Sequence, residues 1–128
     1  MAAKKVAGAA SKSCRGSLAG INRLTTDLNL LRANRLYGCD GLMPKVKELI
    51  AENARCNGWL IFYTHDVSEQ PSNIGCTPEF FEATVRCVAK SGAQIVTVAQ
   101  ALMLSSTVQV SGDARQRENN ERSLSTTA

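Results

Sequence analysis

An uninterrupted apolar stretch in the middle of the chain restricts the fold more than any other feature. Residues 59–67, WLIFYTHDV, are rich in aromatic and β-branched side chains until the run turns polar near its end. This length and composition are typical of a buried strand. Such strands belong mainly to parallel sheets covered by helices, so we expect helical segments on both sides of it in the sequence.

The segment before this strand has the pattern of an amphipathic helix. Its apolar side chains fall on one face at helical spacing: Val46, Leu49, Ile50 and Ala54. Pro44 is tolerated in a first helical turn, and Gly58 is a favourable stop. We therefore predict a helix over residues 42–57 that leads directly into the strand.

The segment after the strand starts a second predicted helix. Thr77 is a good N-cap, Pro78 suits the first helical position, and Glu79 favours the positive end of the helix dipole. The predicted buried face of this helix, which ends at Gly92, consists of Phe81, Val85, Val88 and Ala89.

Two further short strands complete the expected domain. One lies near residues 28–33, and the other covers residues 94–98, before a last helical turn or two. Because helices and strands alternate, the expected fold class is α/β, with parallel strands and right-handed crossovers. Residues 1–13 are expected to form a flexible lead-in and residues 105–128 a disordered tail, so the domain covers residues 14–104.

Charge and cysteine content exclude several classes of protein. The 128 residues contain 15 Lys+Arg and 11 Asp+Glu, and the basic residues are scattered without interleaved aromatics, which argues against nucleic acid as a partner. The five cysteines have no Cys-x-x-Cys spacing and are predicted to be reduced thiols of a cytoplasmic protein. No apolar run approaches the ~20 residues of a membrane-spanning helix, so no membrane partner is expected.

His65 is the only histidine of the chain and lies where the apolar stretch turns polar. Strand alternation places it on the same face as Tyr63, while Asp66 points to the opposite face. The loops after parallel strands form the binding crevices of α/β sheets and barrels, so this position suits a catalytic side chain. The alternative is a structural histidine that is hydrogen-bonded to a loop carbonyl.

The stretch GWLIFYTHDVSEQPSNIGCTPEFFEATVRCVAKSGAQIVTVAQAL resembles the C-terminal part of polysaccharide deacetylases of the NodB-homology type, carbohydrate esterase family 4. The upstream CRGSLAGINRLTTDLNLLRANRLYG resembles the preceding part of the same family, so the likeness spans Cys14 to Leu104. It implies the C-terminal half of a distorted (β/α) barrel. The family enzymes remove N- or O-acetyl groups from carbohydrates with a divalent metal, usually zinc.

The resemblance implies roles for three residues. His65, in THDV, matches the family's general acid, which protonates the leaving group. Arg15, in CRG, is the candidate for an arginine that helps orient the catalytic base. Tyr63 stands where the family often has a leucine that lines the acetyl pocket, so the shape of this pocket is expected to differ.

The metal ligands of the family are missing from this sequence. The family uses one Asp and two His as ligands and a further Asp as base, in the patterns Thr-Phe-Asp-Asp and His-x-x-x-His, and neither pattern occurs here. A complete barrel takes ~250 residues. We therefore expect no cofactor in this chain, no activity of the chain alone, and an acetylated carbohydrate as substrate once an N-terminal half completes the enzyme.

Two alternatives from other classes remain open. The first is a non-enzymatic carbohydrate-binding or scaffold protein that keeps half of the fold. The second is a cysteine hydrolase in which Cys76 is the nucleophile and His65 the base. Unpaired strand edges of a half-barrel would in addition favour self-association.

Overall fold

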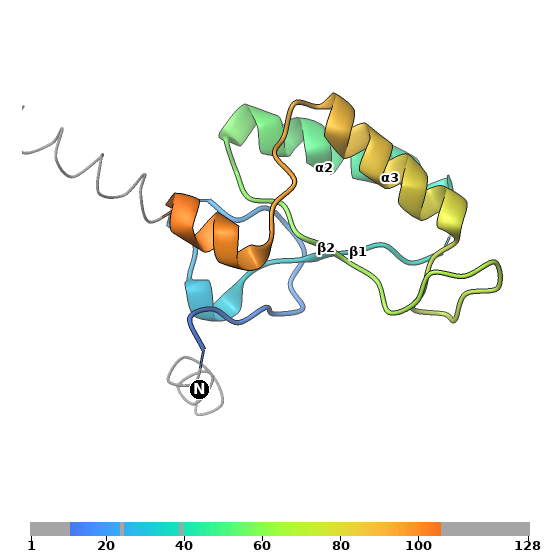
Figure 1. Cartoon of the computed structure of the whole chain (residues 1–128), viewed down its shortest axis with the longest axis horizontal. Coiled ribbons are helices and arrows are strands. Elements are labelled where there is room, and N and C mark those ends of the chain that lie inside the picture. The colour runs from blue at the N-terminus through green and yellow to red at the C-terminus, as the bar shows by residue number, and fades with distance from the viewer. Residues whose placement is uncertain (1–10, 24, 39, 106–128) are drawn as a thin grey trace, which may run out of the picture. The chain divides into compact units, whose positions relative to one another are not determined.

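The computed structural model describes residues 11–23, 25–38 and 40–105 (Figure 1). Within these ranges the structure is mixed α/β, with three α-helices and one two-stranded parallel sheet. The chain divides into two compact units, residues 1–95 and residues 96–128. Apart from residues 11–13 and 105, the predicted lead-in and the predicted tail lie outside the described residues.

The sheet belongs to a β-α-β unit. Strands β1 (Asn34–Arg35) and β2 (Phe62–Tyr63) are parallel, and helix α2 (Met43–Cys56) connects them. The backbone N–H of Leu36 donates to the Tyr63 carbonyl at 2.8 Å and extends the ladder beyond β1. The predicted α/β class with parallel strands is thus confirmed for this unit, and the helix predicted over residues 42–57 is present.

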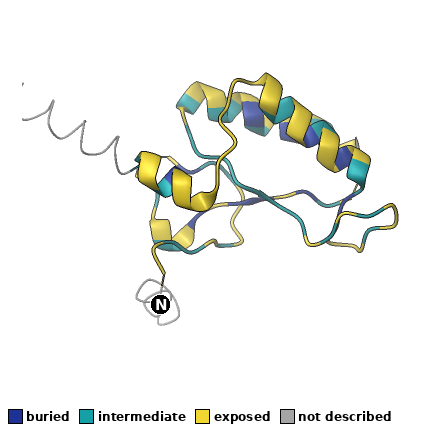
Figure 2. Cartoon of the chain, viewed as in Figure 1, coloured by how far each residue is buried: buried dark blue, intermediate teal, exposed yellow. Residues whose placement is uncertain are grey.

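The core lies between the sheet and two helices, α2 and α3 (Pro78–Lys90). We define the core cluster as its buried members: Leu36, Val46, Ile50, Cys76 and Phe80. Figure 2 shows buried residues at intervals along α2 and α3, with exposed residues between them. Each helix therefore buries one stripe, as amphipathic helices do.

The start of α3 agrees with the prediction, but its predicted buried face is wrong in part, because only Val88 of that face packs against the core cluster. The Thr77 hydroxyl accepts a hydrogen bond from the Phe80 N–H at 3.3 Å and caps the helix. Phe81 and Val85 are exposed, whereas Phe80 and Thr84 are buried. A polar residue can occupy this face because the Thr84 hydroxyl donates to the Phe80 carbonyl at 2.9 Å and is not left unsatisfied.

The central strand is shorter and less buried than predicted. In the stretch over residues 59–67 only β2 belongs to the ladder, and its two residues are half-buried. Leu60 and Phe62 pack against the core cluster, as alternation predicts for one face. The opposite face carries Tyr63 and His65 and is not part of the apolar core, which is why the strand is not buried on both sides.

The predicted strand near residues 28–33 is also wrong in its position. Leu28–Leu30 forms a 3₁₀ turn, η1, in which the Asp27 carboxylate accepts from the Asn29 N–H at 2.9 Å. Such a local bond competes with strand pairing. Only Leu31 forms a bridge in this stretch, to Arg15, and regular pairing begins later, at β1.

The predicted strand over residues 94–98 is replaced by the start of a helix. Residues 94–97 have no strand partner in the part of the chain that the structure describes, and a helix covers residues 98–105. The Gln100 N–H donates to the Thr97 hydroxyl at 3.2 Å, and the Thr97 N–H donates to the Gln100 side-chain oxygen at 2.9 Å. This reciprocal capping box favours a helix N-terminus over a strand. None of the helices in the described ranges has the length and apolar character needed to cross a bilayer.

Candidate functional site

The three residues singled out in the sequence lie together on the face of β2 that points away from the core cluster. The guanidinium carbon of Arg15 lies 4.2 Å from the centroid of the Tyr63 ring. The Tyr63 and His65 rings are 6.4 Å apart and nearly perpendicular. The fold thus joins Arg15, which is distant in the sequence, to two neighbouring residues at the carboxyl end of β2.

Two further residues, which the sequence analysis missed, complete the group. The Tyr37 ring lies 5.8 Å from that of Tyr63 and 6.0 Å from that of His65. The guanidinium carbon of Arg35 lies 5.7 Å from the Tyr37 centroid. We call these five residues the arginine–tyrosine cluster: Arg15, Arg35, Tyr37, Tyr63 and His65.

A signal for the two missed residues is present in the sequence. Arg35 and Tyr37 stand two positions apart in NRLYG, so they share one face of an extended segment. Arg35 is also the register partner of Tyr63 in the parallel ladder. The spacing places Arg35 and Tyr37 on one face, whereas the register that brings them to Tyr63 depends on the distant strand β2.

Arg15 is held in place by backbone hydrogen bonds of its two neighbours. The Leu31 N–H donates to the Cys14 carbonyl at 2.9 Å, and the Gly16 N–H donates to the Leu31 carbonyl at 2.8 Å. Space is tight here, because a Cβ on Gly16 would lie 3.0 Å from the Leu30 side chain. The backbone on both sides of Arg15 is therefore bonded to Leu31, which holds the arginine beside Tyr63.

His65 is exposed at the end of β2. Its backbone N–H donates to the Ile74 carbonyl at 3.2 Å, which anchors the loop that follows the strand. Its imidazole makes no hydrogen bond to any protein group within the described ranges. This disagrees with the alternative of a structural histidine bonded to a loop carbonyl, since the exposed side chain has no protein partner in these ranges.

Asp66 organises the loop behind His65 and does not bond the imidazole. Its carboxylate accepts hydrogen bonds from the Ser72 hydroxyl at 2.5 Å and from the Ser72 N–H at 3.0 Å. These two bonds, with a smaller contribution from the charge of nearby His65, lower the pKa of Asp66. Gly75 leaves room for this arrangement, since a Cβ there would lie 2.2 Å from an Asp66 carboxylate oxygen.

The pKa of Tyr37 depends on its neighbours in the arginine–tyrosine cluster. Desolvation and the adjacent Tyr63 raise the pKa of Tyr37, and the positive charges of Arg35 and Arg15 offset only part of that rise. Tyr37 is consequently a neutral hydroxyl at ordinary pH. Arg35 lies over the Tyr37 ring and Arg15 over the adjoining Tyr63 ring, so both guanidinium groups lie beside the same pair of tyrosines.

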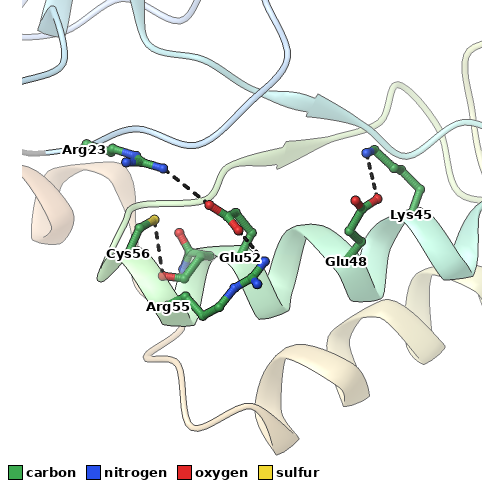
Figure 3. A network of polar contacts seen from close by, with 7 residues as sticks. Arg23, Lys45, Glu48, Glu52, Arg55 and Cys56 are labelled. Carbon is green, nitrogen blue, oxygen red and sulfur yellow. Dashed lines mark hydrogen bonds and ion pairs between the residues drawn. The ribbon is translucent and has the colours of Figure 1, made fainter.

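Several other basic residues of this unit are paired with carboxylates, as Figure 3 shows for α2. Arg23 lies 3.4 Å from Glu52, which also pairs with Arg55, and Lys45 lies 2.8 Å from Glu48. These are exposed pairs, each contributing little to stability. Arg15 and Arg35 differ from them, because neither has a carboxylate partner in the part of the chain described.

The cysteine hydrolase alternative does not fit the structure. The Cys76 side chain is 0% exposed and belongs to the core cluster. His65 is exposed on the other side of the strand, and a fully buried thiol is not accessible to a substrate. Cys76 is therefore a packing residue.

The described residues do not fit the metal centre of polysaccharide deacetylases. No three side chains of His, Cys, Asp or Glu gather among them in a way that could hold a metal ion. A site of the family type would need ligands from outside these residues. The arginine–tyrosine cluster is a constellation of cations, hydroxyls and one imidazole, which suits proton donation and anion binding.

Comparisons with protein-family models, with curated proteins and with solved structures give no match to this chain. The likeness to polysaccharide deacetylases therefore rests on the sequence motifs, and the function has to be inferred from those motifs together with the geometry of the arginine–tyrosine cluster.

Proposed function

We propose that this chain supplies the acid side of a polysaccharide deacetylase active site, and that its fold is the C-terminal half of the barrel of that family. One observation carries the proposal: Arg15, Tyr63 and His65, chosen from sequence motifs, gather at the carboxyl end of a parallel strand. That end carries the reacting groups in α/β enzymes with parallel strands.

In this proposal His65 is the proton donor. Cleavage of an acetyl group from a sugar leaves an amine or an alkoxide, and both are poor leaving groups unless a proton arrives as the bond breaks. An exposed imidazole without a protein hydrogen-bond partner in the described ranges can reach the leaving nitrogen or oxygen. The two tyrosine rings beside it restrict the directions from which a sugar can approach.

Arg15 is proposed as a positioning residue. Its guanidinium carbon lies over the Tyr63 ring, and an arginine held on an aromatic face can still donate from its N–H groups. A fixed fork of donors is suited to a bidentate bond with a carboxylate, such as a catalytic base supplied by the other half of the site. Tyr63 itself is proposed to border the acetyl pocket.

The chain is proposed to be inactive alone, because the sequence contains only one histidine and neither metal-binding pattern of the family. The test is to mix the chain with a separately made N-terminal half of a polysaccharide deacetylase that carries both patterns, and to measure acetate release from an acetylated oligosaccharide with zinc. We expect release only from the mixture.

In the same mixture, His65→Ala should lower the rate of acetate release by ~10²–10⁴-fold, the usual contribution of general acid catalysis. Glu69→Ala, an exposed change in the loop after β2, is the matched control and should leave the rate unchanged. Acetate release by the chain alone would contradict the proposal. So would a His65→Ala variant that loses zinc binding, since His65 would then be a metal ligand.

A non-enzymatic carbohydrate-binding protein is the second candidate. The exposed arginines and half-buried tyrosines favour it, because they form a polar and aromatic surface that needs no metal to bind a sugar. Oligosaccharide binding by the chain, without acetate release in the mixing experiment, would favour this candidate over the enzyme.

A further inference from the structure

Arg15 and Arg35 form a second feature of the cluster, which the proposed chemistry does not use in full. They come from different segments of the chain, yet their guanidinium carbons lie over two tyrosine rings that contact each other, at 4.2 Å and 5.7 Å. Proton donation by His65 requires no pair of arginines. Two neighbouring guanidinium groups without a carboxylate partner in the described residues leave uncompensated positive charge at this position.

No ion pair compensates the two arginines within the described residues. Tyr37 is a neutral hydroxyl, and the Asp66 carboxylate, next to His65 in the sequence, accepts its hydrogen bonds from Ser72 and not from either arginine. Guanidinium groups that stack on aromatic rings keep their edge donors free, and such forks match the oxygens of carboxylates and sulfates. The cluster is therefore built to receive an anion.

The same contacts argue against a neutral sugar as the principal ligand. A pyranose ring would normally lie on an open aromatic face. Here Arg15 covers one face of the Tyr63 ring, and the Tyr37 ring meets that of Tyr63 edge to face. The tyrosine hydroxyls interact with each other, so the N–H donors of the two arginines are the main recognition elements that remain.

We propose that Arg15 and Arg35 bind an anionic group of the carbohydrate, a carboxylate or a sulfate ester, beside the sugar unit that His65 meets. The substrate class of the site is accordingly an acidic polysaccharide. This inference rests on the proposed function for the identity of the ligand as a carbohydrate, but its test measures binding and needs no catalysis.

The experiment is a calorimetric titration of the full chain with three oligosaccharides of equal length. One is an oligouronate, one is sulfated, and one is a neutral N-acetylated chitooligosaccharide. We expect at least one charged oligosaccharide to bind, with an affinity that falls as salt rises, and the neutral one to bind at least about tenfold more weakly. The charged compound that binds identifies the group as carboxylate or sulfate.

Variants locate the site. Arg15→Gln and Arg35→Gln should each weaken binding of the charged oligosaccharide about tenfold or more, as expected for loss of hydrogen bonds to a charged group. Arg86→Gln, which removes an exposed arginine paired with Glu82 on α3, is the matched control and should bind like the unchanged chain. Arg35→Lys should bind more tightly than Arg35→Gln but less tightly than the unchanged chain, because lysine keeps the positive charge without the paired N–H donors of a guanidinium group. Circular dichroism checks that each variant is folded.

Equal binding of the neutral and charged oligosaccharides would overturn the inference, as would unchanged binding by both glutamine variants. Neither outcome touches the proposed function, which is decided by acetate release in the mixing experiment. Conversely, tight binding of a charged oligosaccharide without acetate release in the mixing experiment would support this inference and contradict the proposed deacetylase function.

Discussion

The two faces of β2 have opposite physical characters although their residues alternate along the same few positions. On one face Leu60 and Phe62 pack against the core cluster. On the other, Tyr63 and His65 contact Tyr37 and an arginine and remain partly or fully open to solvent. Alternation of side chains in a strand makes this division possible within one short segment.

The comparison shows that the core residues and the candidate site residues lie on different faces of the strand. Burial of apolar area stabilises by about 25 cal/mol per Å², so the face toward α2 and α3 dominates the free energy of folding. Exposed cation–π contacts contribute only ~0.5–1 kcal/mol each. Substitutions on the two faces of the strand should therefore have different consequences, which the following predictions test in order of decreasing effect.

The largest loss of stability is expected from Phe80→Ala. Phe80 is 0% exposed at the centre of the core cluster, and removal of its ring should lower the free energy of unfolding by about 3–5 kcal/mol. Phe81→Ala is the matched control, because the neighbouring phenylalanine is 41% exposed and should cost at most about 1 kcal/mol. Urea denaturation of both variants gives the difference, and equal losses would show that α3 buries another face.

A smaller loss is expected from Gly75→Ala, in the loop behind His65. The new Cβ would lie 2.2 Å from an Asp66 oxygen, so the bonds between Asp66 and Ser72 would have to shift, at a cost of about 1–3 kcal/mol. Gly41→Ala is the control, since a Cβ there meets nothing within 4 Å. Thermal unfolding compares the two, and indistinguishable melting temperatures would mean that this loop is not closely packed.

The pH dependence of stability should reveal Asp66. Its pKa is lower in the folded chain than in the unfolded one, so its contribution is fully present above the unfolded value of about 3.9 and is lost as the pH falls through the folded pKa. Ser72→Ala removes the main cause of the lowered pKa and should flatten the acid limb of a plot of unfolding free energy against pH. If the acid part of this plot were the same in Ser72→Ala as in the unchanged chain, the loss of stability at low pH would come from other carboxylates.

The smallest effect on stability is expected from His65→Ala, the change with the largest expected effect on activity. His65 is exposed and has no side-chain hydrogen bond within the described ranges, so the free energy of unfolding should change by no more than about 0.5 kcal/mol. Phe62→Ala, on the opposite face, is the contrasting variant and should be clearly destabilising. A large loss for His65→Ala would break the division between a stabilising and a functional face.

Local signals predicted the helices well and the strands poorly. The Thr77 cap and the apolar spacing around Val46 and Ile50 act over a few residues, and both appear in the structure as expected. Strand pairing depends on a distant partner, which local patterns do not specify. As a result β1 begins at Asn34 and not at residue 28, and residues 94–97 form no strand pairing within the described ranges. The Thr97–Gln100 capping box is a local signal in the sequence and indicates the helix start that follows residue 97.

The sequence by itself determined the α/β class, both helices of the first unit, and the choice of Arg15, Tyr63 and His65 as candidate site residues, because all of these depend on short motifs and local periodicity. Only the tertiary structure decided that these three residues meet, that Arg35 and Tyr37 join them, and that Phe80 and not Phe81 is buried. The physical reason is that such outcomes depend on strand register and on the rotation of a helix against its neighbours. A shift of one residue in either moves a side chain to another face, and no local pattern specifies it.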